Sequence, residues 1–345
     1  MFRYASIPAV LRIDIEPDDH QSATNEGSWD GFVALAAIVD QLRQRLADQS
    51  GYAAHPTWML RFDPDIGRCF GRPDDVVRRH VALFNRLIDC QDPLGIHVHA
   101  HRWDSEQGAA FSDYADSAWA TLCVDSSADV FQTVFGKPVR RSSQGGYFLT
   151  EPILDVLIRR GIEVDLTVEP GLKAKSADLS FGTHATAPST DFRVFPRRPY
   201  YPARGASDAP ASSFSDARPI LLLPLTSYDS YTALLPLSRR LVRKLKRRPR
   251  NHLPLSMWRE WPSPKVYWDL VSQAAEDQPE RYLAFAVRTD SPASEFHRRV
   301  RNILEYLPMH PIASRLRFVD PLSEEIRALA VPSPETRITA LRGHC

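Results

Sequence analysis

The feature that most constrains the fold is the alternation of short apolar runs with helical patterns along most of the chain. Strand-like runs cover residues 10–16, 57–62, 94–101, 139–143, 162–168, 220–225, 283–287 and 316–319. Helical spacing covers residues 29–47, a segment from residue 73, and residues 111–135, 150–160, 264–276 and 293–307. Such alternation predicts a largely parallel sheet, and about eight strands in one domain favour a β/α barrel over an open sheet.

Composition and charge limit the partners of this chain. Its 345 residues include 43 Lys and Arg against 42 Asp and Glu, so no global field favours nucleic acid, and we expect no nucleic-acid partner. The four cysteines are scattered without a C-x-x-C motif, which fits a reduced compartment. The first residues lack the basic start and long apolar run of a secretory signal. We therefore expect a cytoplasmic protein.

Two segments depart from the alternation inside the barrel domain that we expect over residues 1–330. Residues 170–218 are rich in Pro, Ser, Ala and Arg and predict a long irregular excursion on the substrate side. Residues 234–250 combine leucines with eight Arg and Lys. They predict either a helix that contacts a membrane surface peripherally or a solvated helix packed on the barrel, and the second is favoured. Residues 331–345 are interpreted as a tail.

Three histidines alternate in the predicted strand 94–101. His97, His99 and His101 are two residues apart, so an extended strand would point all three side chains to one face. Imidazole is the commonest metal ligand, and a converging pair or triplet at a strand end suits zinc or iron. The alternative is a polar surface strand, which the apolar Ile96 and Val98 on the other face disfavour.

Acidic residues close the first predicted strand. Asp14 and Glu16 share one face, and a buried strand rarely ends in acids unless they bind a cation or exchange protons. One carboxylate with two histidines leaves metal positions open for water and substrate, and the other carboxylate can take a proton from water. The alternative is an acidic helix cap, which explains Asp18 and Asp19 well and Asp14 poorly.

These two motifs resemble those of the polysaccharide deacetylase superfamily, whose members share the NodB-homology domain. The resemblance implies a distorted barrel of the (β/α)7 type with a divalent metal, by default Zn²⁺. It implies that Asp14 is the general base and that Glu16, His97 and His101 bind the metal. His99, between the two histidine ligands, would face the substrate. The implied activity is hydrolysis of an acyl group, usually N-acetyl, from a carbohydrate or a lipid-linked sugar.

Weaker matches to the same family follow. The segment SQGGY at 143–147 is similar to the family's Arg-Ala-Gly-Gly segment, where the arginine orients the base. Here that position is Ser143, and Arg141, two residues earlier on the same strand face, is the expected substitute. By the same resemblance, Tyr147 and Asp165 are expected on the substrate side.

The last predicted strand departs from the family pattern. It normally ends in a histidine that acts as general acid, and the matching residue is Arg288. Arginine holds its proton too tightly to donate it, so Arg288 would stabilise an oxyanion or form an ion pair with Asp290. The proton could then come from His99, His20 or Asp290, or the substrate could be an ester.

This departure keeps two alternatives to the carbohydrate deacetylase open. One is a catalytically impaired protein of the same fold that binds a sugar or a lipid-linked glycan. The other is a hydrolase of amide bonds outside glycans.

Overall fold

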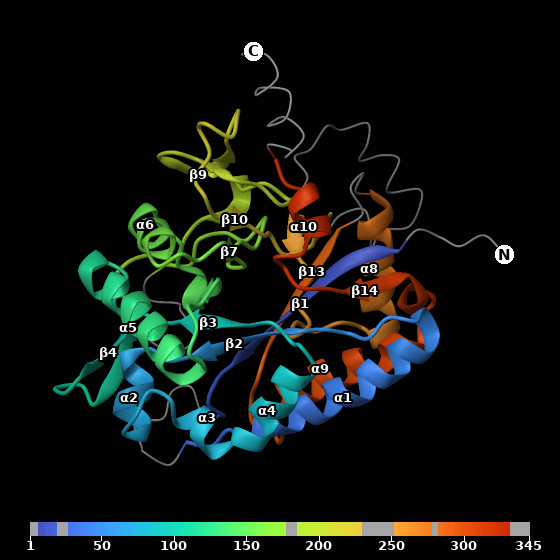
Figure 1. Ribbon diagram of the computed structural model, residues 1–345, viewed down its shortest axis with the longest axis horizontal. Coiled ribbons are helices and arrows are strands. Elements are labelled where there is room, and N and C mark those ends of the chain that lie inside the picture. The colour runs from blue at the N-terminus through green and yellow to red at the C-terminus, as the bar shows by residue number, and fades with distance from the viewer. Residues whose placement is uncertain (1–5, 19–26, 177–184, 230–251, 278–281, 332–345) are drawn as a thin grey trace.

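Parallel strands form the centre of the molecule, a computed structural model that describes residues 6–18, 27–176, 185–229, 252–277 and 282–331. The main sheet runs in the order β10-β7-β6-β3-β2-β1-β13, and β14 also pairs with β1 (Figure 1). Its strands are β1 (Ile7–Ile15), β2 (Thr57–Arg61), β3 (Leu94–Val98), β6 (Arg141–Gln144), β7 (Val164–Asp165), β10 (Leu221–Leu222), β13 (Leu283–Arg288) and β14 (Leu316–Phe318). Every pairing in this sheet is parallel, as the alternation predicted.

The sheet curls into a distorted barrel. Beyond β10 the chain reaches β13 at the other end of the strand order, where the Thr226 amide donates to the Ala284 carbonyl at 2.9 Å. The Ala284 amide donates in turn to the Thr226 hydroxyl at 2.7 Å. These bonds bring the two ends of the strand order together, so the predicted β/α barrel is confirmed.

Alternating side chains divide the core into two layers. Odd positions of β1, such as Leu11 and Ile13, join a large cluster between the strands and the helices. Val10, on the opposite face, packs in a smaller cluster with Met59 and Leu166 from other strands of the barrel. Because strands alternate their side chains, Arg12 and Asp14 share the inner face with Val10. The charged groups at the end of β1 therefore point into the barrel.

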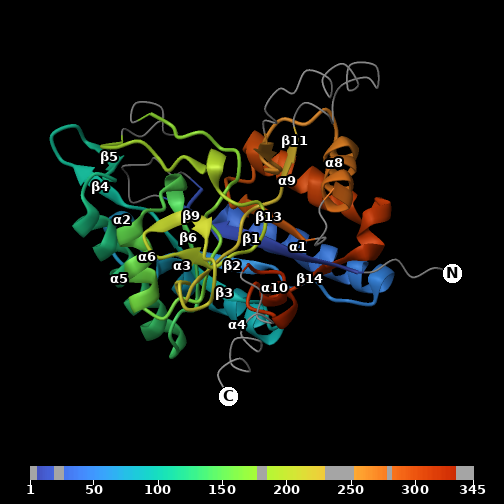
Figure 2. The ribbon, with the colours of Figure 1, turned by 90° about the horizontal axis from the view of Figure 1, so that it is seen from above.

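Helices cover the outside of the sheet, as Figures 1 and 2 show from two directions. They are α1 (Asp30–Ser50), α2 (Pro64–Phe70), α3 (Asp75–Arg79), α4 (Val81–Asp89), α5 (Ser117–Phe135), α6 (Glu151–Arg159), α8 (Pro264–Asp277), α9 (Glu295–Tyr306) and α10 (Glu324–Ala328). The helical spacing of residues 29–47 is confirmed, since α1 buries Phe32, Leu35, Val39 and Leu42 on one face. Helix α1 packs beside α9, and α5 packs beside α6.

Some predicted boundaries were wrong. The strand expected over 94–101 ends at Val98, and His101 begins β4 (His101–Asp104), which pairs antiparallel with β5 (Ala109–Ser112). This hairpin delays helix α5 until Ser117, where the Asp116 side chain accepts from the Trp119 amide and caps the helix. The helix expected from residue 73 is divided into α3 and α4.

Outside the main sheet the chain forms short elements. They are β8 (Pro202–Ala203), β9 (Ala206–Pro210), β11 (Ser227–Asp229), β12 (His252–Pro254), and the 3-10 turns Gly145–Tyr147, Phe192–Val194, Leu307–Met309 and Pro311–Arg315. The basic segment 234–250 and the tail from residue 332 lie outside the described residues, so the membrane-contact and tail interpretations stay predictions. Among the described helices, none has the length and apolar character that crossing a membrane requires.

Candidate metal centre and active site

Acidic and histidine side chains meet at the carboxyl ends of the central strands, where ligands bind in parallel α/β folds. Asp14 lies at the end of β1 and Glu16 follows it, while His97 lies near the end of β3. All three side chains are buried, with 3 to 4 % of their surface exposed. The acidic residues at the end of β1 therefore lie beside His97 of β3, as the sequence predicted.

Three side chains offer atoms close enough to share one metal ion. Glu16, His97 and His99 each contribute one ligand atom, and these atoms all lie within 4.8 Å of one another. The Nε2 atoms of His97 and His99 are 3.0 Å apart. The Glu16 carboxylate lies 3.5 Å from His97 Nε2 and 3.6 Å from His99 Nε2. One carboxylate with two imidazoles is the donor set expected from the sequence.

The second histidine of this cluster differs from the expected ligand His101. Because β3 ends at Val98, the three histidines do not share a continuous strand face. The Nε2 atom of His101 lies 3.1 Å from Nδ1 of His99, and its Nδ1 atom lies 3.6 Å from Asp65. His99 therefore occupies the place in the cluster that the sequence predicted for His101. His101 contacts the ring nitrogen of His99 that faces away from the cluster.

A glycine fixes the place of the His99 ring. The ring lies against Gly145, and a Cβ atom built on Gly145 would come within 2.2 Å of His99 Nε2. That distance is shorter than real Cβ contacts allow, so any larger residue would displace the imidazole. The SQGGY segment singled out in the sequence thus serves the histidine cluster through its first glycine.

A buried arginine behind Glu16 was not predicted. Arg61, at the end of β2, is 1 % exposed and donates from Nε and Nη2 to Asp63 at 2.9 and 3.0 Å. Its Nη1 atom lies 3.6 Å from Glu16, and Nη2 lies 3.6 Å from Asp65. Asp65 also contacts His101, so Arg61, Asp65 and His101 form a connected set of polar contacts beside the cluster. The sequence signal was the charged end of the strand TWMLRFDPD, which parallels that of VLRIDIE.

The charge states of His99 and Asp65 are compatible with a bound cation. Burial, reinforced by the charge of Arg61, holds the pKa of His99 well below its usual value. Burial alone would raise the pKa of Asp65, but the hydrogen bond with His101 and the charge of Arg61 lower it. A neutral imidazole keeps a lone pair for a metal, and ionised carboxylates supply the negative charge. These residues therefore fit a divalent metal.

The predicted base, Asp14, is held by two neighbours. Arg12, on the same strand, contacts Asp14 through Nη2 at 2.9 Å and also donates to the Leu166 carbonyl. Ser143 donates to Asp14 Oδ1 at 3.1 Å and lies 2.8 Å from His97 Nδ1. In the family resembled, an arginine at the position of Ser143 orients the base. Here the guanidinium that contacts the Asp14 carboxylate belongs to Arg12 of β1, whereas position 143 lies in β6.

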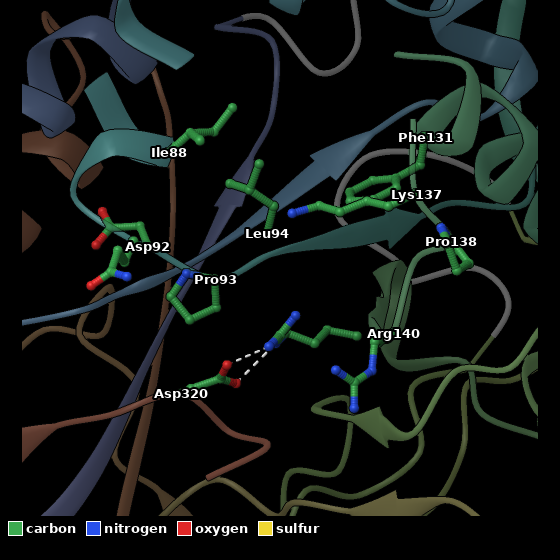
Figure 3. A pocket seen from close by; sticks show the side chains of 11 residues that line it. Ile88, Asp92, Pro93, Leu94, Phe131, Lys137, Pro138, Arg140 and Asp320 are labelled. Carbon is green, nitrogen blue, oxygen red and sulfur yellow. Dashed lines mark hydrogen bonds and ion pairs between the residues drawn. The ribbon is translucent and has the colours of Figure 1, made fainter. Parts of the chain in front are cut away.

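Arg141, the expected substitute for that arginine, lies elsewhere, so this prediction was wrong. It is the first residue of β6 and forms a bidentate ion pair with Asp320. Dashed lines in Figure 3 mark these hydrogen bonds to Asp320. The two residues line a cavity of about 280 Å³ with Pro93 and Leu94, which precede or begin β3 (Figure 3). That cavity is at the amino ends of the strands, opposite Asp14, so Arg141 cannot orient the base.

The remaining predicted site residues have separate environments. Asp165 is fully buried, accepts from Ser142 Oγ at 2.7 Å and from the Thr167 amide at 2.9 Å, and so links β6 to β7. Arg288 pairs in register with Asp14 across β1 and β13. Its guanidinium stacks 4.5 Å from the Phe296 ring, and it lies 3.8 Å from Asp290. His20, a candidate proton donor, lies outside the described residues.

Tyr147 has an unusual backbone. Its φ of 60° lies in the left-handed region that non-glycine residues rarely adopt, and such strain often marks a functional site. Lys175 places its ammonium 4.5 Å from the Tyr147 ring. Burial raises the pKa of the Tyr147 hydroxyl, and the charge of Glu169 raises it further.

Solved structures with a similar fold exist, although the sequence is divergent. No protein-family model matches the sequence, and no curated protein matches it. A proposed glycoside hydrolase or deacetylase of Parabacteroides distasonis aligns with TM-score 0.50 and 11% identity, over 91% of this chain and 69% of that one. A proposed polysaccharide deacetylase of Mycobacterium smegmatis aligns with TM-score 0.43 and 9% identity, over 99% and 93% of the two chains. The peptidoglycan deacetylase PdaC of Bacillus subtilis gives TM-score 0.36 and 7% identity, over 98% and 93%. The chain therefore has a distorted β/α barrel fold that the Parabacteroides distasonis protein shares, in a divergent sequence.

Proposed function

We propose that this protein is a metal-dependent hydrolase that removes an acyl group, in the first instance N-acetyl, from a carbohydrate or a sugar-containing conjugate. The observation that carries the proposal is the position of Asp14 beside the Glu16, His97 and His99 cluster. Ser143 contacts both parts, at 3.1 Å from Asp14 and 2.8 Å from His97. A buried base next to a metal-type donor set is the arrangement that hydrolysis of an amide or ester needs.

The donor set favours zinc as the metal. Glu16, His97 and His99 would hold it, with Glu16 fixed from behind by Arg61 at 3.6 Å. Zinc prefers nitrogen and carboxylate ligands and leaves a position open when the protein supplies three. When bound, such a metal supplies Lewis acidity that polarises the acyl carbonyl and favours deprotonation of water.

The chain's own residues perform the proton transfer. Asp14 takes a proton from the attacking water, and the contact with Arg12 at 2.9 Å orients its carboxylate. The Ser143 hydroxyl donates to the other Asp14 oxygen, so both oxygens have fixed partners. Burial of Asp14 to 4 % exposure excludes bulk water from the base and strengthens these contacts.

A carbohydrate substrate is supported by the sequence motifs and by the fold. The Parabacteroides distasonis protein with the same fold is described as a glycoside hydrolase or deacetylase. The test is acetate release from an N-acetylglucosamine oligomer by purified protein loaded with Zn²⁺. We expect release by the wild type and loss of about 10²-fold or more in Asp14→Asn, because the amide cannot accept the proton.

Metal content tests the site separately from activity. We expect the wild type to bind one equivalent of Zn²⁺, measured by elemental analysis after dialysis, and His97→Ala or His99→Ala to lose it. His55→Ala is the matched control, because His55 contacts the Cys90 carbonyl at 3.1 Å and is no part of the cluster. Unchanged metal content in both His97 and His99 variants would refute the proposed centre.

Arg288 favours a second candidate function. It stands where the resembled family has its proton-donating histidine, and arginine does not donate its proton. A glycan-binding protein without hydrolysis would retain the barrel and need no acid. This candidate predicts binding of the same oligomer, measured by calorimetry, with no acetate release from the metal-loaded wild type.

A further inference from the structure

Glu169 is a further buried carboxyl group, separate from Asp14 and from the Glu16, His97 and His99 cluster. Glu169 follows β7 at the carboxyl end of the barrel strands and is 1 % exposed. Its Oε1 atom is buried and has no hydrogen-bond partner among the described residues. An ionised carboxylate in such a place would be costly, whereas a neutral carboxyl group that faces a ligand would not.

The charged neighbours of Glu169 connect it to the catalytic base. Arg12 contacts Asp14 at 2.9 Å and donates to the carbonyl of Leu166, three residues before Glu169. Arg12 is the strongest charged influence on Glu169, and Asp14 also acts on it. One guanidinium thus contacts the base Asp14 and the segment that leads to Glu169, and its charge acts on Glu169 as well.

Two further cationic side chains act on this carboxyl group. Lys175 and Arg259 act on Glu169 electrostatically, and Lys175 lies 4.5 Å from the ring of Tyr147, the residue with φ 60°. Arg288 acts on both Tyr147 and Lys175. Glu169 therefore belongs to the same mouth of the barrel as Arg288, where the resembled family has its general acid.

We propose that Glu169 is the general acid that protonates the leaving nitrogen. The proposal rests on the proposed hydrolase function and supplies the acid that Arg288 cannot be. Its basis is a buried carboxyl group whose Oε1 atom has no hydrogen-bond partner among the described residues, three residues after the Leu166 carbonyl that accepts from Arg12, the partner of Asp14. Two carboxyl groups with different environments can divide the roles of acid and base between them.

The proton balance of the reaction is complete with these two groups. Water loses a proton to Asp14 and forms a bond to the acyl carbon, which gives a tetrahedral intermediate. The Glu169 O–H bond then breaks as an N–H bond forms, and the C–N electron pair goes to the nitrogen. The products are an amine and an acid, Glu169 is left ionised, and exchange with solvent returns both carboxyl groups to their starting states.

The environment of Glu169 supports a proton at neutral pH. Burial raises the pKa of Glu169 to about 7, against the lowering influence of Arg12 and Arg259, and Asp14 raises it further. Lys175, whose own pKa burial lowers to about 8, also favours the ionised form of Glu169. A general acid is most efficient when its pKa is close to the working pH.

The experiment compares leaving groups in Glu169→Gln and wild type, both loaded with Zn²⁺. An activated ester, 4-nitrophenyl acetate, leaves without protonation, whereas the amide of an N-acetylglucosamine oligomer requires it. We expect Glu169→Gln to lose about 10²-fold or more of kcat on the amide and less than about threefold on the ester. The amide rate of the wild type should fall as pH rises through about 7, and this limb should be absent from the variant. Glu163→Gln is the control, because Glu163 lies on the surface in ion pairs with Arg140 and Arg327.

The outcomes separate this inference from the proposed function. The retained ester rate shows that the variant is folded and keeps its metal, so a selective amide loss supports Glu169 as the acid. Equal losses on both substrates, or an unchanged amide rate, would overturn the assignment while the hydrolase function stands. A wild type without activity on either substrate would overturn both.

Discussion

Glu169 should lower the folding stability of the wild type as the pH rises, whereas most carboxylates raise it. Replacement of Glu169 by glutamine should remove this loss of stability. Burial raises the pKa of Glu169 from 4.5 to about 7. The folded state therefore keeps a proton that the unfolded chain releases, so this group favours folding fully below pH 4.5. That contribution is lost as the pH rises to about 7, and at about 1.4 kcal/mol per pH unit the loss is about 3 kcal/mol.

Glutamine imitates the protonated carboxyl group and cannot ionise. We therefore expect Glu169→Gln and the wild type to have similar free energies of unfolding at pH 4. At pH 7.5 the variant should be more stable by about 3 kcal/mol. Urea denaturation at pH 4, 5.5 and 7.5 measures this difference and stays below the pKa of Lys175, which is about 8.

The control for this measurement is Glu163→Gln. The hydrogen bond from Arg140 lowers the pKa of Glu163, so its ionised form favours folding. This variant should therefore become less stable than the wild type as the pH rises. If the difference between Glu169→Gln and the wild type were constant from pH 4 to 7.5, Glu169 would have an ordinary pKa and the reasoning would be refuted.

Three further predictions concern the base, the histidine cluster and the far end of the barrel. Gly145→Ala should push the His99 ring aside and weaken Zn²⁺ affinity by about 10- to 100-fold in a chelator competition, with an unfolding free energy changed far less. Arg12→Gln should lower kcat for acetate release by roughly 10²-fold and destabilise folding by about 3 kcal/mol in urea, because the buried Asp14 carboxylate loses its cationic partner and keeps the Ser143 hydroxyl. Arg141→Ala should leave acetate release unchanged and cost about 1 kcal/mol or less of stability, since its ion pair with Asp320 is partly exposed; a lower kcat would contradict its placement.

The fold could be predicted because each central strand is buried on both faces. A strand such as β1, with apolar residues at both odd and even positions, differs clearly from the one-sided helical spacing of α1. Segments without that contrast were placed less well. The hairpin of β4 and β5 contains the polar sequence HRWD and follows β3 with only two residues between, so periodicity gave no boundary.

The candidate site could be predicted only where its residues are close in sequence to a strand end. The meeting of Glu16 with His97 follows from parallel strands, whose carboxyl ends lie at one edge of the sheet. The exchange of His101 for His99 depends on where β3 ends, which is a tertiary property. Glu169 carries no local signal, because a carboxyl group in a loop of average composition gives no indication that it is buried.

The roles of Ser143 and Arg12 at the proposed base depend on each other physically. Ser143 is fully buried between Asp14 and His97, at 3.1 and 2.8 Å, which leaves no room for an arginine side chain at that position. A serine there can bridge the base to a metal-type ligand but cannot neutralise the base. The charge must then come from another element, and Arg12 reaches Asp14 from two residues earlier on β1. Arg12 also donates to the carbonyl of Leu166, three residues before Glu169. One cation, Arg12, thus contacts the proposed base directly and holds the segment that leads to the proposed acid.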